Sequence, residues 1–534
     1  MALLKKIVEK LQKVHRLGFS NAWFIFKKRC RDRQNRVNPI SLSETDKKKI
    51  LADSKRKRTS IAVLLRLGET FDVGDKEAAA AVMGQLYGKF HLHEVRSQLE
   101  QGGFREAMLW NQVAAQCQED YLVLCQRGVK LSPAALWMFA EKIDETGANL
   151  LYCDEQRGTE KMYKPDFGID TFLGQDYLGG VLCVKNDVWK EMEGLSETSA
   201  DPFADMILRI YERGGCIAHI PEILFSSDAR GVFPEIGEAV LKEHEEALKL
   251  SEKVSEHPLV SVIIPNKDHV KILRQCIDSI LQKSTYDRYE ILVIENNSTQ
   301  QETFAYYGEL ERETRVRVIT CMTDWNYSYI NNFGAKEAKG EYLLFLNNDT
   351  EVIAPDWMEE MLRFAMRPDV GAVGAKLFYP DGTIQHGGVT LGIRGVAGHA
   401  FRGEPGNSPG YMNRLVTVQN LSAVTAACMM VPAVIFHKME GFDERYKVAF
   451  NDTDLCMRIR KAGYLIVYNP NAQLHHYESK SRGQDEKSLE KLRRFNEESE
   501  RFQRQWCREL EMGDPYYNHH LSVWSDNFAP VENG

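Results

Sequence analysis

The chain has 534 residues, of which 43% are hydrophobic and 27% are charged. This length exceeds what a single hydrophobic core supports, so we expect roughly two or three domains of ordinary globular composition. No run of about 18 apolar residues is present, which argues against a membrane-spanning helix.

Positive charge is concentrated at the start of the chain. Residues 1–58 hold 18 Lys and Arg against 5 Asp and Glu, a local net charge of +13, whereas the whole chain carries −8 and the remainder therefore −21. A basic arm on an acidic body predicts an anionic partner for the arm.

Residues 1–57 combine these charges with an amphipathic helical pattern and the aromatic run Trp23-Phe-Ile-Phe26. This combination is typical of a helix that lies in the interface of an anionic membrane. A helix docked on the protein itself is the alternative, and nucleic-acid binding is a third interpretation that no recognised motif supports.

The positions of lysines and cysteines in the sequence indicate the cellular location. Lysines interrupt the first apolar stretch, so no signal peptide is expected. The 11 cysteines are scattered without a Cys-x-x-Cys pair. They fit reduced thiols better than a disulfide framework or a zinc site. We expect a cytoplasmic protein, peripheral on the inner face of the cytoplasmic membrane.

Strand and helix signals alternate over residues 58–250. Strands are predicted at 59–66, 90–95 and 121–125, and a helix at 76–89. This alternation predicts an α/β domain with a mostly parallel sheet covered by helices.

Residues 257–484 repeat the pattern more clearly. Strands are predicted at 259–264, 289–294 and 464–468, and helices at 270–282 and 331–339. A further apolar strand starting at Glu341 is expected to deliver Asp349 to an exposed tip. The tail, residues 485–534, is charged and helical up to about Leu510 and is expected to pack back on the body.

The two domains resemble an internal repeat with different chemistry. Where the second domain has Asn347-Asn348-Asp349, the first has Gln126-Arg127-Gly128. The first domain also has Phe203 in the place of Asp452. It therefore keeps the core pattern without the acidic groups. The matched framework positions are Asn111 with Asn332, Tyr121 with Tyr342, Asp205 with Asp454 and Arg209 with Arg458.

Six short motifs in one order carry a family resemblance. They are VSVIIP (260–265), ENNS (295–298), LNND (346–349), DGTIQH (381–386), NDTDLCMR (451–458) and HHYESKSRG (475–483). With them, residues 259–483 resemble family 2 glycosyltransferases of the GT-A fold, especially bacterial enzymes of O-antigen and cell-surface polysaccharide synthesis. Residues 58–230 resemble the same fold more distantly. The resemblance implies a degenerate GT-A copy followed by a catalytic one.

The resemblance implies a divalent cation, Mg²⁺ or Mn²⁺, at Asp349, where it would balance the charge of the donor's diphosphate. Asn347 stands at the first acid of the family's Asp-x-Asp motif and can bond a ribose hydroxyl or a metal-bound water, with Asn348 beside it at the donor. His476, rather than His475, is the favoured additional ligand. A turn-capping role for Asp349 is the alternative.

Asp452 is the predicted general base. An acceptor hydroxyl loses its proton as it attacks the anomeric carbon, and a carboxylate within reach can take it. A single base opposite the leaving group implies inversion. The family usually shows Glu-Asp here, whereas this chain has Asn451-Asp452. A helix-capping role is the alternative for Asp452, and Asp454 is predicted to be structural because Asp205 matches it.

Other candidates surround the donor. By the resemblance, Glu295 would accept the N–H of uracil or thymine, and Arg482 would hold the diphosphate. His386 belongs to a loop near the acceptor, and Trp325 either lines the donor sugar or packs in the core. Strand-end positions expected at the nucleotide pocket are Pro265, Lys267, Glu295 and Asn297.

The leading prediction is an inverting glycosyltransferase. It would use dTDP-rhamnose or a UDP-sugar and a hydroxyl of a surface polysaccharide or lipid-linked oligosaccharide. A non-catalytic glycan-binding or scaffold protein is one alternative. A metal-dependent nucleotidyltransferase is another, although no Gly-rich phosphate loop follows the strand at 259–264. No nucleic-acid partner is expected.

Overall fold

The computed structural model describes residues 39, 41–96, 104–229, 233–250, 257–477 and 489–531. These fall into two compact units. The first unit comprises the described residues within Asp32–Leu250 and Asn518–His520, and the second those within Ser251–Tyr517 and Leu521–Gly534. The arm up to residue 38 and the segment 478–488, which contains Arg482, lie outside the described residues.

None of the described helices has both the length and the apolar character needed to cross a bilayer.

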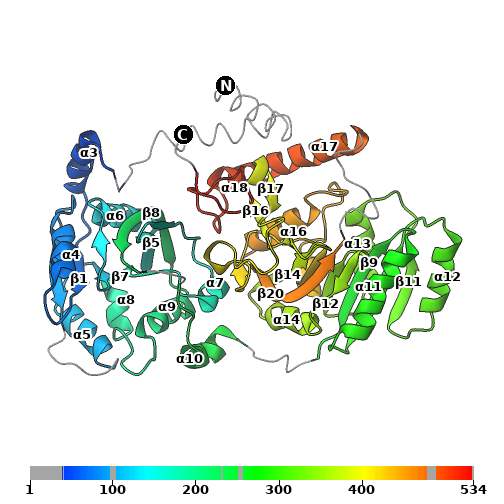
Figure 1. The fold of residues 1–534 in the computed structure, drawn as a ribbon, viewed down its shortest axis with the longest axis horizontal. Coiled ribbons are helices and arrows are strands. Elements are labelled where there is room, and N and C mark those ends of the chain that lie inside the picture. Colours follow the sequence, from blue (N-terminus) through cyan, green and yellow to red (C-terminus); the bar gives the residue numbers. More distant parts are fainter. Residues whose placement is uncertain are drawn as a thin grey trace. The chain divides into compact units, whose positions relative to one another are not determined.

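The first unit is built on an eight-stranded sheet (Figure 1). The strand order is β2-β1-β3-β7-β5-β8-β4, with β6 paired to β5. Its strands are β1 Ile61–Arg66, β2 Phe90–Val95, β3 Tyr121–Cys125, β4 Lys130–Leu131, β5 Leu150–Arg157, β6 Glu160–Met162, β7 Val181–Lys185 and β8 Ile217–Ser227. Its helices are α3 Glu44–Ser54, α4 Val73–Met83, α5 Phe104–Ala114, α6 Ala135–Thr146, α7 Ile169–Gly174, α8 Asn186–Glu191, α9 Pro202–Glu212 and α10 Glu238–Leu248.

The second unit is built on a ten-stranded sheet of order β11-β10-β9-β12-β19-β14-β20-β13, with β15 on β14 and β18 on β20. Its strands are β9 Val260–Asn266, β10 Tyr289–Glu295, β11 Val316–Thr320, β12 Tyr342–Leu346, β13 Thr350–Val352, β14 Val370–Phe378, β15 Ile384–His386, β18 Gln419–Asn420, β19 Cys428–Pro432 and β20 Leu465–His476, besides a separate pair, β16 Val389–Leu391 and β17 Ala397–His399. Its helices are α11 Val270–Lys283, α12 Gln301–Leu310, α13 Tyr327–Glu337, α14 Trp357–Ala365, α15 Ala433–Lys438, α16 Asn451–Lys461, α17 Leu489–Gln505 and α18 Cys507–Met512, with short 3-10 turns η1 Ile393–Gly395 and η2 Tyr411–Asn413.

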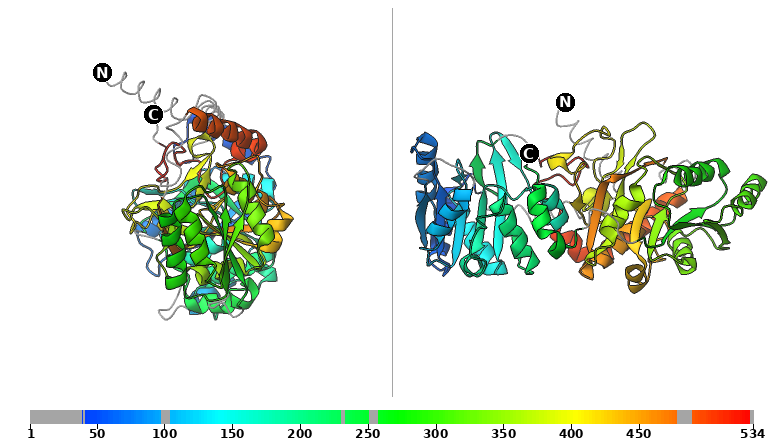
Figure 2. Two further views of the ribbon diagram at one scale, coloured as in Figure 1. Left: turned by 90° about the vertical axis from the view of Figure 1, so that its right-hand side faces the viewer. Right: turned by 90° about the horizontal axis from the view of Figure 1, so that it is seen from below.

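Helices cover both faces of the second unit's sheet (Figures 1 and 2). On one face, Val262 and Ile264 pack with α11, α12 and α14. On the other, Ile263 packs with α13, α15 and α16. A strand buried on both faces needs apolar residues at every position, which explains the continuous apolar runs of the sequence.

Each sheet combines parallel strands, as the sequence pattern predicted, with antiparallel ones. In the second unit β19 runs antiparallel to both of its neighbours, β12 and β14. In the first unit β7 does the same between β3 and β5. A short buried strand shows the same apolar run in either direction, so the pattern could not reveal this.

The two sheets repeat one topology. The path β2-β1-β3-β7-β5-β8-β4 has the same parallel and antiparallel pairings as β10-β9-β12-β19-β14-β20-β13, and the second unit adds β11 at its edge. Side chains repeat too. The amide of Asn111 bonds both backbone groups of Leu195, and that of Asn332 bonds both backbone groups of Phe442.

A buried ion pair repeats as well. Arg209 donates to Asp205, and Arg458 donates to Asp454, both across one helical turn. The carboxylate of Asp454 is fully buried, and burial raises the pKa of Asp454 despite the neighbouring guanidinium of Arg458. The side chains of Gln505 and Trp506 also donate to Asp454. The tail helix α17 is therefore part of the second unit, and Asp454 is structural as predicted.

Element ends differ from the predicted ones where caps decide them. The helix predicted at 76–89 is α4, which starts after the N-cap Asp72 and stops before Gly84. The helix predicted at 331–339 is α13, which starts after the N-cap Asn326. The strand predicted at 464–468 continues to His476, because a register shift accommodates Pro470.

Candidate active site

The turn Asn347–Asp349 joins β12 to β13 at the ends of the parallel strands. Asp349 is only 5% exposed, so the prediction of an exposed tip is wrong. The reason is that β20 runs beside β13, with Thr350 opposite His476. The last residues of β20 cover the carboxylate of Asp349.

One of the two adjacent histidines faces that carboxylate. His476 Nε2 lies 3.2 Å from Asp349 Oδ1 and 3.2 Å from Asn347 Nδ2. His475 lies opposite Glu351 in the register, and its ring is near Phe378. Successive side chains of a strand point to opposite faces, so His476, and not His475, joins the Asp349 turn.

The groups around Asp349 suit a cation. His476 Nε2 accepts a hydrogen bond from the Asn347 amide only when it is unprotonated, and its lone pair then faces a carboxylate oxygen. His476 Nδ1 is buried and has no hydrogen-bond partner among the described residues. A carboxylate, an imidazole and an amide meet here, and the first two are ordinary metal ligands.

The segment Thr425–Ala427 connects this turn to Asp452. The backbone N–H of Asn347 donates to the carbonyl of Ala427 at 3.0 Å. The backbone N–H of Ala426 donates to Asp452 Oδ2 at 3.1 Å. Successive residues of one segment therefore hold the two acidic turns.

Asp452 lies in the first turn of α16 and is half-buried. Its Oδ1 accepts the backbone N–H of Thr453 at 2.7 Å. Phe450, and not Asp452, occupies the N-cap position. Oδ1 also accepts the hydroxyl of Thr453 at 3.2 Å, whereas Oδ2, which accepts the N–H of Ala426, keeps lone-pair capacity for a further bond.

His386 lies beneath the connecting segment. Its ring is fully buried, with Nδ1 2.9 Å from His399 Nδ1 and Nε2 3.4 Å from the backbone N of Thr425. Burial, with the nearby His399 and His476, holds the pKa of His386 well below its usual range. The neutral ring supports Thr425 from within rather than offering an open surface to an acceptor.

A chain of hydrogen bonds joins the ends of three strands. Asn348 donates to Asn266 at 2.7 Å, Asn266 donates to the hydroxyl of Tyr307 at 2.8 Å, and Tyr307 donates to Glu295 at 2.6 Å. All of these except Asn348 are buried. This chain sets the relative positions of β9, β10 and β12 where the predicted donor pocket lies.

The predicted nucleotide-binding residues are found at these strand ends. Glu295 also accepts the backbone N–H and the hydroxyl of Ser298, so its carboxylate shapes its own turn. Asn297 has a left-handed backbone, with φ 56°, and donates to Thr323 O at 2.6 Å. Pro265 is buried within β9, and Lys267 is exposed just beyond this strand. Base recognition by Glu295 stays a prediction.

Trp325 packs against the apolar cluster that includes Tyr327 and Phe436. Its indole Nε1 is buried and lacks a hydrogen-bond partner among the described residues. Of the two interpretations of Trp325, the contacts support core packing.

Comparisons with known proteins agree with this geometry. Residues 261–439 match the family model described as Glycosyl transferase family 2. The matched residues run from β9 to the end of α15 in the second unit. The fold around them is a mixed sheet between two helical layers.

Three relatives are informative. The uncharacterized protein y4gI of Sinorhizobium fredii is 36% identical, over 77% of this chain and 49% of its own length. The O-antigen biosynthesis protein RfbC of Myxococcus xanthus is 34% identical, over 77% of this chain and 34% of its own length. An N-acetylglucosaminyl-diphospho-decaprenol L-rhamnosyltransferase of Mycobacterium tuberculosis is 29% identical, over 27% of this chain and 50% of its own length. The chain spans half the length of these relatives or less.

The second unit differs from the first at the positions of Asp349, Asp452 and His476. The repeat aligns Gly128 with Asp349, Phe203 with Asp452 and Ser227 with His476. Arg127 aligns with Asn348 and lies against Gly68, where its guanidinium pairs with Asp72. The first unit thus has no carboxylate at either acidic position.

Sequence reasoning did not identify some residues of this candidate site. Asn266 and Tyr307 carry the hydrogen-bond chain, and Ala426 holds Asp452 through its backbone. The polar end of an apolar strand was a signal for Asn266. Ala426 had none, because its contribution does not involve its side chain.

Proposed function

We propose that the chain is a metal-dependent inverting glycosyltransferase. It moves a sugar from a nucleoside-diphosphate donor to a hydroxyl of a cell-surface polysaccharide or lipid-linked oligosaccharide. The single observation that carries the proposal is the attachment of Asn347 and Asp452 to the successive residues Ala427 and Ala426. This links a donor-binding carboxylate turn to a separate half-buried carboxylate, as direct displacement requires.

Asp452 acts as the general base. The acceptor oxygen forms a bond to the anomeric carbon while the bond from that carbon to the diphosphate oxygen breaks. The acceptor's proton goes to Asp452, and the nucleoside diphosphate leaves with the bonding pair. Attack opposite the leaving group inverts the anomeric configuration.

Asp349 and His476 hold the cation, Mg²⁺ or Mn²⁺, and Asn347 supports it. The cation supplies positive charge to the leaving diphosphate. Lys267 and Arg482 add positive charge for the same group. Asn348, Asn297 and Glu295 border the nucleotide at the strand ends, as in other open α/β sheets.

The donor we propose first is dTDP-rhamnose, with UDP-sugars next. The name of the Mycobacterium tuberculosis relative, a rhamnosyltransferase acting on a decaprenyl-diphosphate-linked sugar, favours this donor and a lipid-linked acceptor. The name of the Myxococcus xanthus relative favours a surface polysaccharide. An acceptor of this kind suits a cytoplasmic enzyme whose basic arm contacts the anionic inner face of the membrane. The first unit, without the acidic groups, is non-catalytic.

The test is mass-spectrometric detection of nucleoside diphosphate released from dTDP-, UDP- and GDP-sugars, with Mn²⁺ or with a chelator. Donor binding is measured in the same samples. Wild type is compared with Asp452→Asn and with Asp356→Asn, an exposed carboxylate elsewhere in the domain. Metal-dependent release from one donor that only Asp452→Asn abolishes supports the proposal. Donor binding without release in the presence of lipid-linked acceptors favours a glycan-binding scaffold, and the absence of both overturns the proposal.

A further inference from the structure

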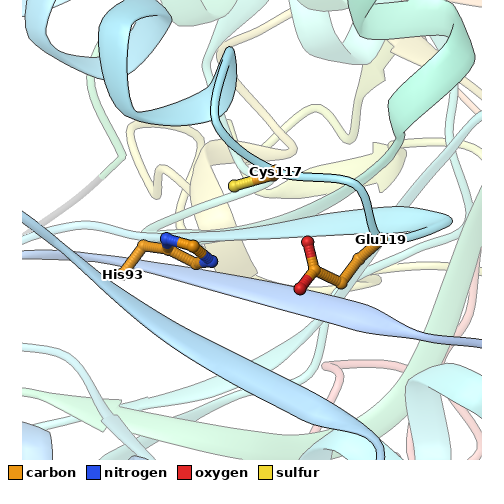
Figure 3. Close-up of side chains that lie close together, drawn as sticks. All are labelled: His93, Cys117 and Glu119. Atoms are coloured by element: carbon orange, nitrogen blue, oxygen red, sulfur yellow. The ribbon is translucent and has the colours of Figure 1, made fainter.

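A mixed cluster of metal-binding side chains lies in the first unit, apart from the groups that match the active site. His93 is on the edge strand β2, and Cys117 and Glu119 are in the segment between α5 and β3. One ligand atom from each lies within 4.8 Å of the others. Figure 3 shows the sulfur, the imidazole and the carboxylate directed toward one another.

The fold explains why these groups meet. Phe90 and Leu92 of β2 pack on the core beneath α4 and α6. The alternation of the strand turns His91 and His93 to the other face. Cys117, just after α5, is fully buried on the chain's return to β3. Residues separated by more than twenty positions are thus brought to one point.

Each of the three side chains has capacity for a ligand. His93 Nε2 is buried and finds no hydrogen-bond partner among the described residues. The thiol of Cys117 has a weak contact with Val113 O at 3.5 Å. A buried imidazole nitrogen and a buried thiol therefore lie beside a carboxylate.

A further residue, His91, holds the carboxylate of Glu119 in place. His91 Nδ1 lies 2.5 Å from Glu119 Oε1, and the backbone N–H of Gln118 donates to Oε2 at 2.9 Å. Carboxylates that bind metal ions are usually held by further hydrogen bonds of this kind. These bonds still leave lone pairs on both oxygens of Glu119.

We propose that His93, Cys117 and Glu119 bind one Zn²⁺ ion. Nitrogen, sulfur and oxygen ligands suit Zn²⁺, whereas Mg²⁺ and Ca²⁺ prefer oxygen alone. Such ligands bind at about 2.0–2.3 Å, so small side-chain rotations close the cluster around one ion, with a water as the fourth ligand. Cys117 binds as thiolate and releases its proton to solvent. The ion ties the edge strand β2 to the segment before β3.

Cobalt substitution of the full chain tests this site. After chelation and dialysis, Co²⁺ is titrated and then displaced by Zn²⁺, and absorption from thiolate-to-cobalt charge transfer is recorded. We expect a thiolate band that saturates at one Co²⁺ per chain. Cys117→Ser should abolish the band, and Glu119→Gln should weaken Zn²⁺ binding at least tenfold. Cys216→Ser, at an exposed cysteine of the same unit, should change neither.

The thiolate band separates this site from two other clusters that lack cysteine, Glu222 with His519 and His520, and Asp205 with Glu243 and His244. Thermal unfolding in chelator checks that each variant folds. A chain that binds neither Co²⁺ nor Zn²⁺, or that binds Co²⁺ without the thiolate band, overturns the proposal. So does binding that persists unchanged in folded Cys117→Ser or Glu119→Gln.

Discussion

His476 lies against Asp349, with Nε2 3.2 Å from Oδ1 across the paired strands β13 and β20. The two residues are 127 positions apart, and both side chains are only 6% exposed. Their neighbour His475 faces the other way. This relationship selects one of two adjacent histidines and makes the metal proposal specific.

We predict that His476→Gln raises the Mn²⁺ concentration needed for half-maximal activity by about 10–100-fold, the usual effect of losing a group that supports a metal. His475→Gln should leave this requirement within about twofold of wild type, since its ring lies by Phe378. Titration of Mn²⁺ in the nucleoside diphosphate assay measures both. Equal effects of the two substitutions would contradict the assignment.

Tyr307→Phe removes the hydroxyl that links Asn266 to Glu295. We expect a loss of about 1 kcal/mol in the free energy of unfolding, because two buried partners each lose a hydrogen bond. The KM for the donor should rise more than kcat falls, since the chain borders the predicted nucleotide pocket.

Tyr306→Phe is the matched control for Tyr307→Phe. The hydroxyl of Tyr306 is buried without a hydrogen-bond partner among the described residues, so its removal should cost nothing or stabilise the fold. Denaturant unfolding and donor kinetics check both variants. If Tyr306→Phe destabilised the protein as much as Tyr307→Phe, the importance of the hydrogen-bond chain would be refuted.

Glu351 gives an acid-sensitive contribution to stability. Partial burial alone would raise its pKa, but hydrogen bonds from Tyr477, Lys283 and Gln275 lower the pKa of Glu351 from 4.5 to about 2. A carboxylate whose pKa is lower in the folded state stabilises the protein above its unfolded value. This contribution is therefore present above pH 4.5 and is lost as pH falls from 4.5 to about 2.

Glu351→Gln should reduce the free energy of unfolding by about 2 kcal/mol at pH 7 and by much less near pH 2. Glu311→Gln, at an exposed carboxylate, should differ little from wild type at either pH. Urea unfolding at a series of pH values measures the difference. A constant difference across that range would contradict the charge-based explanation.

Substitutions of Asn332 and Asn111 test the structural repeat of the two units. Each amide satisfies a backbone N–H and a backbone C=O of the loop it holds, so Asn332→Ala and Asn111→Ala should each cost about 1–3 kcal/mol. Each loss should be confined to its own unit, and hydrogen exchange read by mass spectrometry can locate it. Destabilisation of both units by one substitution would contradict two separate cores.

Local sequence pattern was sufficient for much of the fold and part of the site. The strands predicted at 90–95 and 121–125 coincide with β2 and β3, because buried strands need continuous or alternating apolar residues. Spacing alone matched Asn111 with Asn332, and polar residues at the end of an apolar strand marked Asp349. These features depend on neighbours along the chain.

Only the tertiary structure decided the rest. Whether His475 or His476 faces Asp349 depends on the register of β20 against β13, and a shift of one residue would exchange them. Packing between distant segments decides three further features. It buries Asp349, it places the backbone N–H of Ala426 on Asp452, and it brings His93 close to Cys117. Side-chain periodicity gives the two faces of a strand, but only the assembled sheet determines what each face meets.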